Sequence, residues 1–359
     1  GQVLIERCIA GWKEIEFEVM RDASDRAITI CGMENIDPVG VHTGDSVVVA
    51  PIMTLNDHDL RMLNDSAIKI LRTLKIQGGC NVQFALNPKT SEYYLIEINP
   101  RVSRSSALAS KASGYPIARV TAKVAVGMNL DEIAVANTTA AFEPSLDYVV
   151  AKLPRFPFDK FSTAANTLGT QMKATGEVMS IGRTMEESLL KAVRSLETGV
   201  CHIYHKKFDT MSDDEMLTYI KEGTDDRLYA IAQLIRNGVD LALIYNNTKI
   251  DMFFLEKFKN IVEFENVVRA HPMDVETLRA AKRMGFSDKY IGQLWGLSQN
   301  EMYRLREKNN VFPVYKMIDT CASEFASYVP YFYSTYEEEN ESIVSGKEKI
   351  IVLGSGPIR

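Results

Sequence analysis

The first 150 residues alternate between short apolar runs and turn residues, which is the pattern of β-strands joined by tight connections. The β-rich runs predict strands at 3–5, 14–21, 27–33, 46–50, 81–86, 93–99 and 148–153. Apolar residues on one side of a 3.6-residue period predict helices at 57–74 and 105–126. Most of these predicted strands follow one another directly, as in hairpins, and do not alternate strictly with helices. The sequence therefore predicts an α+β fold.

From about residue 184 the pattern becomes helical. Helices are predicted at 185–197, 213–222, 225–237, 251–268, 275–284, 288–294 and 299–308. Candidate N-caps precede or begin several of them: Asp213, Asp225, Asp274, Ser287 and Ser298. A separate all-helical domain is therefore predicted after the α+β part.

The net charge of −6 excludes non-specific nucleic-acid binding as a default, because such binding depends on an excess of cations. The helix pair at 288–308 resembles a helix-turn-helix in outline, but its basic side chains are few: Arg304, Arg306 and Lys308. Five dispersed cysteines without a CxxC motif indicate reduced thiols. No apolar run reaches the roughly 18 residues of a spanning helix, so we expect a cytoplasmic protein that is not embedded in a membrane.

Both ends of the sequence look interrupted. The chain opens without a methionine inside the apolar run at 3–5, and it stops at a glycine-containing turn after the apolar run at 350–353. We therefore expect a fragment of a longer protein.

The strongest local signal is the pair of predicted strands at 81–86 and 93–99, joined by a six-residue polar link. In an antiparallel hairpin of this length Gln83 and Glu97 face each other, and Asn99 lies on the same face as Glu97. One carboxylate and two amide oxygens suit Mg²⁺, which takes few protein ligands and completes its shell with water and phosphates. The alternative is a hairpin whose polar face meets solvent.

Two neighbouring segments carry further candidate chemistry. Arg101 and Arg104 follow the hairpin among serines, and guanidinium groups beside a metal suit phosphate or carboxyphosphate recognition; an exposed basic turn is the alternative. The polar, glycine-marked segment 31–46 has the length of a binding loop. His42 in this loop is a candidate for phosphoryl contact or proton transfer, or else a surface residue.

Several motifs together resemble the large subunit of carbamoyl phosphate synthetase, in its first, carboxyphosphate-forming half. They lie at 11–16, 34–46, 81–85, 96–111, 142–148, 173–184, 281–286, 319–325 and 333–336. The run RVSRSS at 101–106 is the most specific of them. A biotin-dependent carboxylase, the nearest rival, typically continues toward RxQVEH at this point.

The resemblance implies an architecture and its boundaries. Residues 1–196 would be the C-terminal part of an ATP-grasp module, residues 197–347 an all-α oligomerisation domain, and residues 348–359 the first strand of the second synthetase half. The N-terminal lobe of the module, which covers the ATP phosphates in this family, is missing. We therefore expect this chain alone not to turn over.

The resemblance also implies roles for single residues. Gln83, Glu97 and Asn99 would hold Mg²⁺ or Mn²⁺ on the ATP phosphates. The implied nucleotide contacts are Arg7 and Ile9 along the adenine, Glu14 on the ribose, and Gly40, Val41 and His42 near the nucleotide and its phosphates. Arg101 would stabilise the transferred phosphoryl group, and Arg104 would lie near the carbamate exit.

Further implied features are a K⁺ site, a tunnel and a set of partners. The K⁺ would lie near Glu14, in a loop formed by Asn35, Asp37, Pro38, Val41 and Ser46, and Glu177 would line the tunnel to the second half. The implied reaction uses bicarbonate, ammonia and two ATP, for pyrimidine and arginine biosynthesis. The implied partners are a small glutaminase subunit and a second large subunit; an inert oligomerisation scaffold is the alternative function.

Three features depart from the family pattern. The segment 133–140 looks about four residues shorter than usual. Arg7 stands where many relatives carry an acidic residue, so only a backbone contact to adenine is expected there. The third departure is the missing N-terminal lobe.

Overall fold

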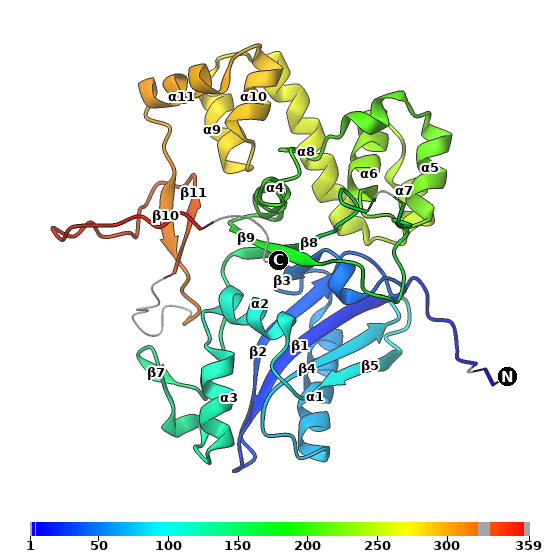
Figure 1. Ribbon diagram of the computed structural model, residues 1–359, viewed down its shortest axis with the longest axis vertical. Coiled ribbons are helices and arrows are strands. Elements are labelled where there is room, and N and C mark those ends of the chain that lie inside the picture. The colour runs from blue at the N-terminus through cyan, green and yellow to red at the C-terminus, as the bar shows by residue number, and fades with distance from the viewer. Residues whose placement is uncertain (1, 4, 162, 322–330, 355–359) are drawn as a thin grey trace.

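The structure is a computed structural model that describes residues 2–3, 5–161, 163–321 and 331–354. A seven-stranded sheet forms the lower half of the molecule in Figure 1, and helices of the second half of the chain lie above it. Its strands are antiparallel throughout, in the order β5–β4–β1–β2–β3–β8–β9. Their bounds are β1 Lys13–Arg21, β2 Ala27–Asn35, β3 Val48–Ala50, β4 Gly78–Leu86, β5 Tyr93–Asn99, β8 Val149–Arg155 and β9 Gly176–Gly182.

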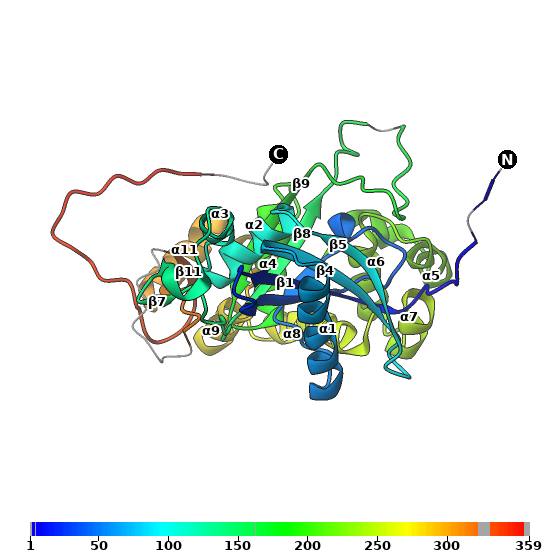
Figure 2. The same cartoon turned by 90° about the horizontal axis from the view of Figure 1, so that it is seen from below.

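Helices cover both faces of the sheet. On β1, Phe17 packs with Leu63 of α1 (Asp57–Thr73) in one apolar cluster. Glu18, the next residue, points to the opposite face, because successive side chains of a strand alternate. There it accepts a 3.0 Å hydrogen bond from Ser106 of α2 (Arg104–Ser113). Figure 2 shows α1 and α2 on the two sides of β1 and β4.

The single helix predicted at 105–126 is wrong, because α2 ends and α3 (Ile117–Ala125) begins within it. Gly114 closes α2 in the left-handed conformation, with φ of 67°, and Pro116 precedes α3. Glycine takes this conformation without steric cost, and proline lacks the N–H that a continuing helix needs. The shortened segment at 133–140 forms a small hairpin of β6 (Ala134–Val135) and β7 (Thr138–Thr139).

The second half of the chain is mainly helical, as predicted. Its helices are α4 Met185–Ser195, α5 Asp213–Lys221, α6 Arg227–Arg236, α7 Leu241–Thr248, α8 Met252–Ala270, α9 Val275–Arg283, α10 Asp288–Trp295 and α11 Gln299–Lys308. The short α7 was not predicted, because its apolar residues come in one run without a clear helical period. No helix in the described ranges has the length and apolarity to cross a bilayer.

Cap predictions for these helices are partly confirmed. Asp274, Ser287 and Ser298 each accept a backbone N–H at a helix start. Asp213 is wrong as a cap, because Ser212 takes that position in a capping box with Glu215.

Two observations correct the all-helical expectation for 197–347. β10 (Val314–Met317) and β11 (Phe332–Thr335) form a two-stranded sheet after the last helix. One continuous apolar cluster also joins strand residues such as Ala151 and Leu153 to the helices. The packing therefore shows no break at 196/197, and the proposed boundary stays a prediction.

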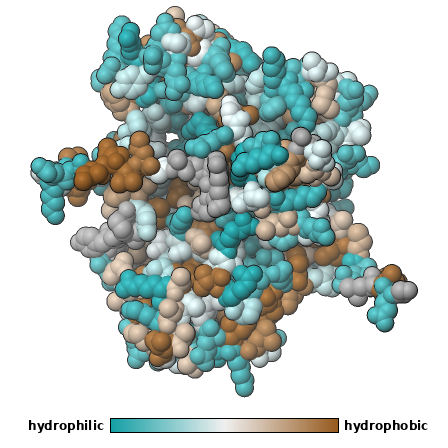
Figure 3. Space-filling view, viewed as in Figure 1, coloured by the Kyte–Doolittle hydropathy of each residue, from teal (hydrophilic) through white to brown (hydrophobic). Residues whose placement is uncertain are grey.

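The apolar runs near both ends form no strand in the described part of the chain. Val3 and Ile5 are 84% and 87% exposed. Residues 350–353 are likewise exposed and lie on the extended segment whose apolar atoms stand out in Figure 3. The strand predicted at 3–5 is not formed at the described residues 3 and 5, because a strand requires a hydrogen-bonded neighbour and none of the described strands pairs with them. The assignment of 348–359 to the first strand of the second synthetase half stays a prediction. Residues 1, 4 and 355–359, and part of the motif at 319–325, lie outside the described residues.

Candidate functional site

The hairpin of β4 and β5 has the predicted register. Gln83 pairs with Glu97, and Asn81 pairs with Asn99. A bulge after Gln83 shifts the pairing toward the turn, but it leaves these two pairs intact. The prediction that Gln83, Glu97 and Asn99 share one face is therefore confirmed.

A row of acidic residues on β1 extends this polar face. Glu16 and Glu18 pair with Gln83 and Asn81 across the β1–β4 ladder. The side-chain nitrogen of Asn81 donates to Glu16 at 3.2 Å and to Glu18 at 3.1 Å. The Asn81 oxygen accepts from Gln83 Nε2 at 2.9 Å. The amide of Gln83 is thus held by its nitrogen, which leaves its oxygen free to bind a ligand.

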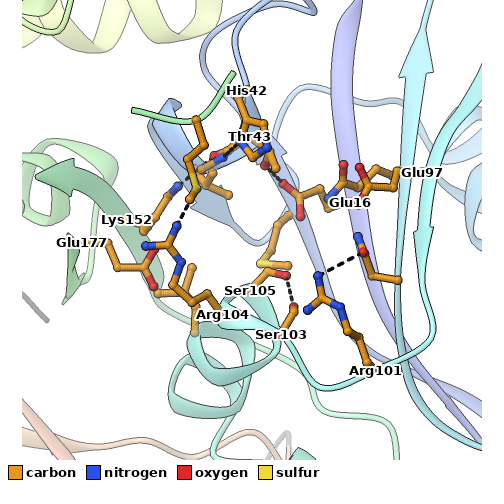
Figure 4. A pocket seen from close by; sticks show the side chains of 17 residues that line it. Glu16, His42, Thr43, Glu97, Arg101, Ser103, Arg104, Ser105, Lys152 and Glu177 are labelled. Atoms are coloured by element: carbon orange, nitrogen blue, oxygen red, sulfur yellow. Dashed lines mark hydrogen bonds between the residues drawn. The ribbon is translucent and has the colours of Figure 1, made fainter. Parts of the chain in front are cut away.

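A cavity of about 330 Å³ opens on this face, within the size range of small-molecule sites. It is lined by Glu16, Met33, His42, Thr43, Gly44, Val48, Gln83, Glu97, Asn99, Arg101, Ser103, Arg104, Ser105, Leu108, Lys152, Met172 and Glu177. Figure 4 shows side chains from the sheet, from α2 and from the loop before β3 converging on it. The structure therefore brings together seven of the predicted residues: His42, Gln83, Glu97, Asn99, Arg101, Arg104 and Glu177.

The other predicted nucleotide contacts do not line this cavity: Arg7, Ile9, Glu14, Gly40 and Val41. Arg7 is at the surface, where it donates to Glu92 at 2.8 Å and to the hydroxyl of Tyr94 at 2.7 Å. Glu14 is buried, and burial together with nearby Glu16 raises its pKa to about 8.

The loop between β2 and β3 is held from several sides. The main-chain N–H of His42 donates to the carbonyl of Gly169 at 2.8 Å, and His42 Nδ1 accepts from the N–H of Gly44 at 2.9 Å. In the neutral ring Nε2 therefore carries the proton. The hydroxyl of Thr43 donates to Glu16, and Lys152 Nζ donates to the Thr43 carbonyl at 3.0 Å.

The residues predicted to hold K⁺ fit a cation only in part. Asn35 is 6% exposed, and neither of its amide atoms has a hydrogen bond of standard geometry to a described residue, although it lies near Glu14 and lowers the pKa of that buried carboxyl. Its oxygen is available to a cation. Asp37 already accepts from Ser46 Oγ at 2.8 Å and forms a buried ion pair with Arg227.

The divalent metal prediction rests on a mixed donor set. No group of three or more His, Cys, Asp or Glu side chains suited to a metal ion occurs in the part of the chain that the structure describes. The candidate set instead has the single carboxylate of Glu97 and the amides of Gln83 and Asn99. Glu97 is exposed toward the cavity, and Gln83 presents its oxygen, so these residues fit a hard ion that keeps several waters.

Sequence reasoning missed three charged residues: Glu16 and Lys152, which line the cavity, and Arg227, which pairs with Asp37 in the loop between β2 and β3. Glu16 was detectable, because Glu14, Glu16 and Glu18 alternate along one strand and so share a face. Lys152 and Arg227 come from β8 and α6, and no motif spacing connects them to the hairpin.

Comparison with known families decides the identity. Residues 1–133 match the model described as carbamoyl-phosphate synthase L chain, ATP binding domain. Residues 177–310 match the model described as carbamoyl-phosphate synthetase large chain, oligomerisation domain. The chain belongs to the carbamoyl phosphate synthetase large-chain family. Its α+β part is thus an ATP-binding, ATP-grasp lobe, and the carbamoyl phosphate synthetase oligomerisation domain follows it.

Solved structures similar to this carbamoyl phosphate synthetase chain include biotin-dependent carboxylases. A complete pyruvate carboxylase from Rhizobium etli is 16% identical over 42% of this chain and 14% of its own, with a TM-score of 0.34. The biotin carboxylase subunit of a pyruvate carboxylase is 14% identical, with coverages of 54% and 47% and a TM-score of 0.41. The ADP-bound biotin carboxylase domain of a thermophilic 2-oxoglutarate carboxylase is 15% identical, with the same coverages and TM-score. The chain thus spans less than half the length of each.

Proposed function

We propose that this chain forms the nucleotide-binding lobe of the carboxyphosphate-forming half of a carbamoyl phosphate synthetase. In this reaction ATP phosphorylates bicarbonate, ammonia converts the carboxyphosphate to carbamate, and a second ATP phosphorylates carbamate in the other half. The observation that carries the proposal is the convergence of Gln83, Glu97 and Asn99 with two arginines on one cavity.

The hairpin end of the cavity would bind the metal and the terminal phosphates. A bound Mg²⁺ or Mn²⁺ would neutralise charge on the phosphoryl oxygens. Glu97 would supply the anionic ligand. Asn81 would fix the orientation of the Gln83 side chain, because Asn81 Oδ1 accepts a 2.9 Å hydrogen bond from Gln83 Nε2.

The arginines would provide fixed positive charge during transfer. Arg101 lies beside the hairpin, with one guanidinium nitrogen 3.4 Å from Asn99 Oδ1, so it would meet the transferred phosphoryl group next to the metal. Arg104, at the start of α2, lies farther along the cavity, beside Met172 and Glu177. His42 would contact the phosphates from the loop opposite.

A route for the product is supported by a second cavity. Glu177 and Leu108 line both the first cavity and a neighbouring one of about 550 Å³, which reaches Gly354. The second cavity thus adjoins the first and lies along β9 and α4. This supports the proposed exit of carbamate past Arg104 and Glu177 toward the second half.

The remaining roles belong to the same proposal. Arg7, Ile9, Glu14, Gly40 and Val41 would border the base and sugar, and K⁺ would lie near Glu14 and Asn35. Ammonia would come from a glutaminase subunit, the helical half would pair large chains, and the enzyme would act in the cytoplasm in pyrimidine and arginine synthesis.

The second candidate is an oligomerisation scaffold, which the match of residues 177–310 favours. Calorimetric titration of ATP with Mg²⁺ into this chain separates the two. The enzymatic proposal expects Mg²⁺-dependent binding that Glu97→Ala abolishes and that Glu263→Ala, an exposed carboxylate on α8, leaves unchanged. Undetectable binding by the unmodified chain, with intact self-association, supports the scaffold.

A further inference from the structure

Lys152 is a buried cation at the cavity that the proposed roles do not use. It lies in the middle of β8, where it pairs with Val48 of β3 and Met179 of β9. The side chain is only 4% exposed, yet it lines the cavity. Its ammonium group carries three donors, and the Thr43 carbonyl at 3.0 Å is its hydrogen-bond partner among the described residues.

The positive charge of Lys152 is not neutralised by an ion pair. In the described part of the chain no carboxylate oxygen lies within 4.0 Å of Lys152 Nζ or of the Arg104 guanidinium. Glu16 lines the same cavity, but its two oxygens accept from Thr43 and Asn81. Glu177, Glu16 and Asp45 attract Lys152 from farther away, while Arg104 repels it.

Two cations therefore approach each other at the end of the cavity away from the hairpin. Figure 4 shows Lys152 and Arg104 on one side, together with Glu177, and Glu97 on the other side. Arg104 contacts the sulfur of Met172 at 2.7 Å, which is a weak acceptor. Glu177 attracts Lys152, but among the described residues it forms an ion pair with neither the buried Lys152 nor the exposed Arg104. A buried ammonium without a paired anion is costly, so a bound anion would stabilise it.

We propose that Lys152 and Arg104 bind the carboxyl group of the anionic substrate, first as bicarbonate and then as the carboxyl end of carboxyphosphate. This inference rests on the proposed function. The phosphoryl end would then face the hairpin and Arg101, so the two ends of the cavity match the two ends of the intermediate.

A purely structural lysine would give a different result. If Lys152 only supports the loop through the Thr43 carbonyl, its loss disturbs His42 and weakens nucleotide binding. If it binds the carboxyl group, its loss weakens bicarbonate binding selectively. A comparison of the change in the KM for bicarbonate with the change in the KM for ATP therefore distinguishes the two roles of Lys152.

The experiment measures bicarbonate-dependent ATP hydrolysis by the full-length protein that contains this chain. Lys152→Met keeps the length and apolar contacts of the side chain and removes its charge. We expect the KM for bicarbonate to rise about tenfold or more, as for a lost charged hydrogen bond, with the KM for ATP within about twofold. Lys152→Arg restores part of the loss, and Lys160→Met, an exposed lysine beyond β8, matches the unmodified enzyme.

Arg104→Met provides a second variant if Lys152→Met does not fold, and the same selective rise is expected. An unchanged KM for bicarbonate in the variant that folds overturns the proposed subsite, and so does an equal rise in the KM for ATP. The Glu97→Ala variant tests the proposed function separately. Absence of bicarbonate-dependent hydrolysis in the unmodified enzyme overturns both.

Discussion

The main-chain N–H of His42 donates a 2.8 Å hydrogen bond to the carbonyl oxygen of Gly169. The neighbouring Leu168 N–H donates to the Gly223 carbonyl at 2.7 Å, at the turn between α5 and α6. Asn166 also donates to Asp225 at 3.0 Å. The loop that carries His42 is therefore tied, through segment 166–169, to the helical half of the chain.

Arg227 provides a second and direct tie between the same parts. It is buried at the start of α6 and pairs with Asp37, which also accepts from Ser46 Oγ at 2.8 Å and from the Val47 N–H at 3.2 Å. Arg227→Gln leaves Asp37 buried with a neutral partner. We expect a loss of about 3 kcal/mol in the free energy of unfolding and weaker ATP binding, because the His42 loop loses its anchor.

Urea unfolding and nucleotide titration check this prediction. Arg283→Gln is the matched control, since Arg283 is exposed and lies 3.9 Å from Glu338. Equal stability of the two variants would show that the Asp37 pair does not hold the loop.

We expect His202 to make the stability of the helical half depend on pH. It is buried, stacks on Tyr290 with ring centroids 3.7 Å apart, and hydrogen-bonds Glu265 at 3.0 Å, while its Nδ1 has no partner among the described residues. Burial lowers the pKa of His202 to about 4. The unfolded chain, with an ordinary histidine pKa near 6.5, binds the proton first, so the free energy of unfolding falls as pH drops from about 6.5 to about 4.

The expected slope from this one group approaches about 1.4 kcal/mol per pH unit within that window. Below about 4.5 Glu265 adds to the loss, because burial opposes its charge but Arg236 and His202 hold its pKa near 2. Denaturant unfolding across pH 2 to 8 measures both contributions. His202→Gln should remove the pH dependence between about 6.5 and 4, whereas His58→Gln, which replaces an exposed histidine, should keep it. Identical stability profiles for the two variants would refute the assignment to His202.

Gly285 allows α9 to approach α4 closely. It has φ of +94°, and a Cβ at this position would lie 2.8 Å from the Cα of Glu187. Gly238 has a similar φ of +84° with open space around it. Gly238→Ala should lower the free energy of unfolding by about 1 kcal/mol through backbone strain. Gly285→Ala should lower it by about 2 kcal/mol more, because the new Cβ overpacks the contact with Glu187. Thermal or urea unfolding of both variants checks this, and equal losses would argue against a crowded contact.

The parts of the site that follow from local pattern were predictable from the sequence. Alternation within two adjacent strands and a short link determine which residues face each other, so Gln83, Glu97 and Asn99 were placed correctly on one face. The break between α2 and α3 was also legible at Gly114 and Pro116, where the helix prediction failed because apolar residues continue on both sides.

The positions of Lys152 and Arg227 were not predictable in this way. Lys152 reaches the cavity only because β3 and β8 pair, which brings together residues about a hundred positions apart in the chain. Arg227 reaches Asp37 because helices of the second half pack on the sheet in one apolar cluster. Such contacts depend on tertiary packing and leave no periodic signal in either segment.

In the proposed function, Glu97 holds the divalent ion on the ATP phosphates together with Gln83 and Asn99. The rate of bicarbonate-dependent ATP hydrolysis in the full-length protein carrying Glu97→Ala tests this role. We expect the rate to fall by about 100-fold or more, because metal-borne charge stabilisation is lost, while glutamine hydrolysis by the proposed glutaminase subunit continues and Glu263→Ala has no effect. An unchanged hydrolysis rate in Glu97→Ala would show that Glu97 does not hold the metal ion.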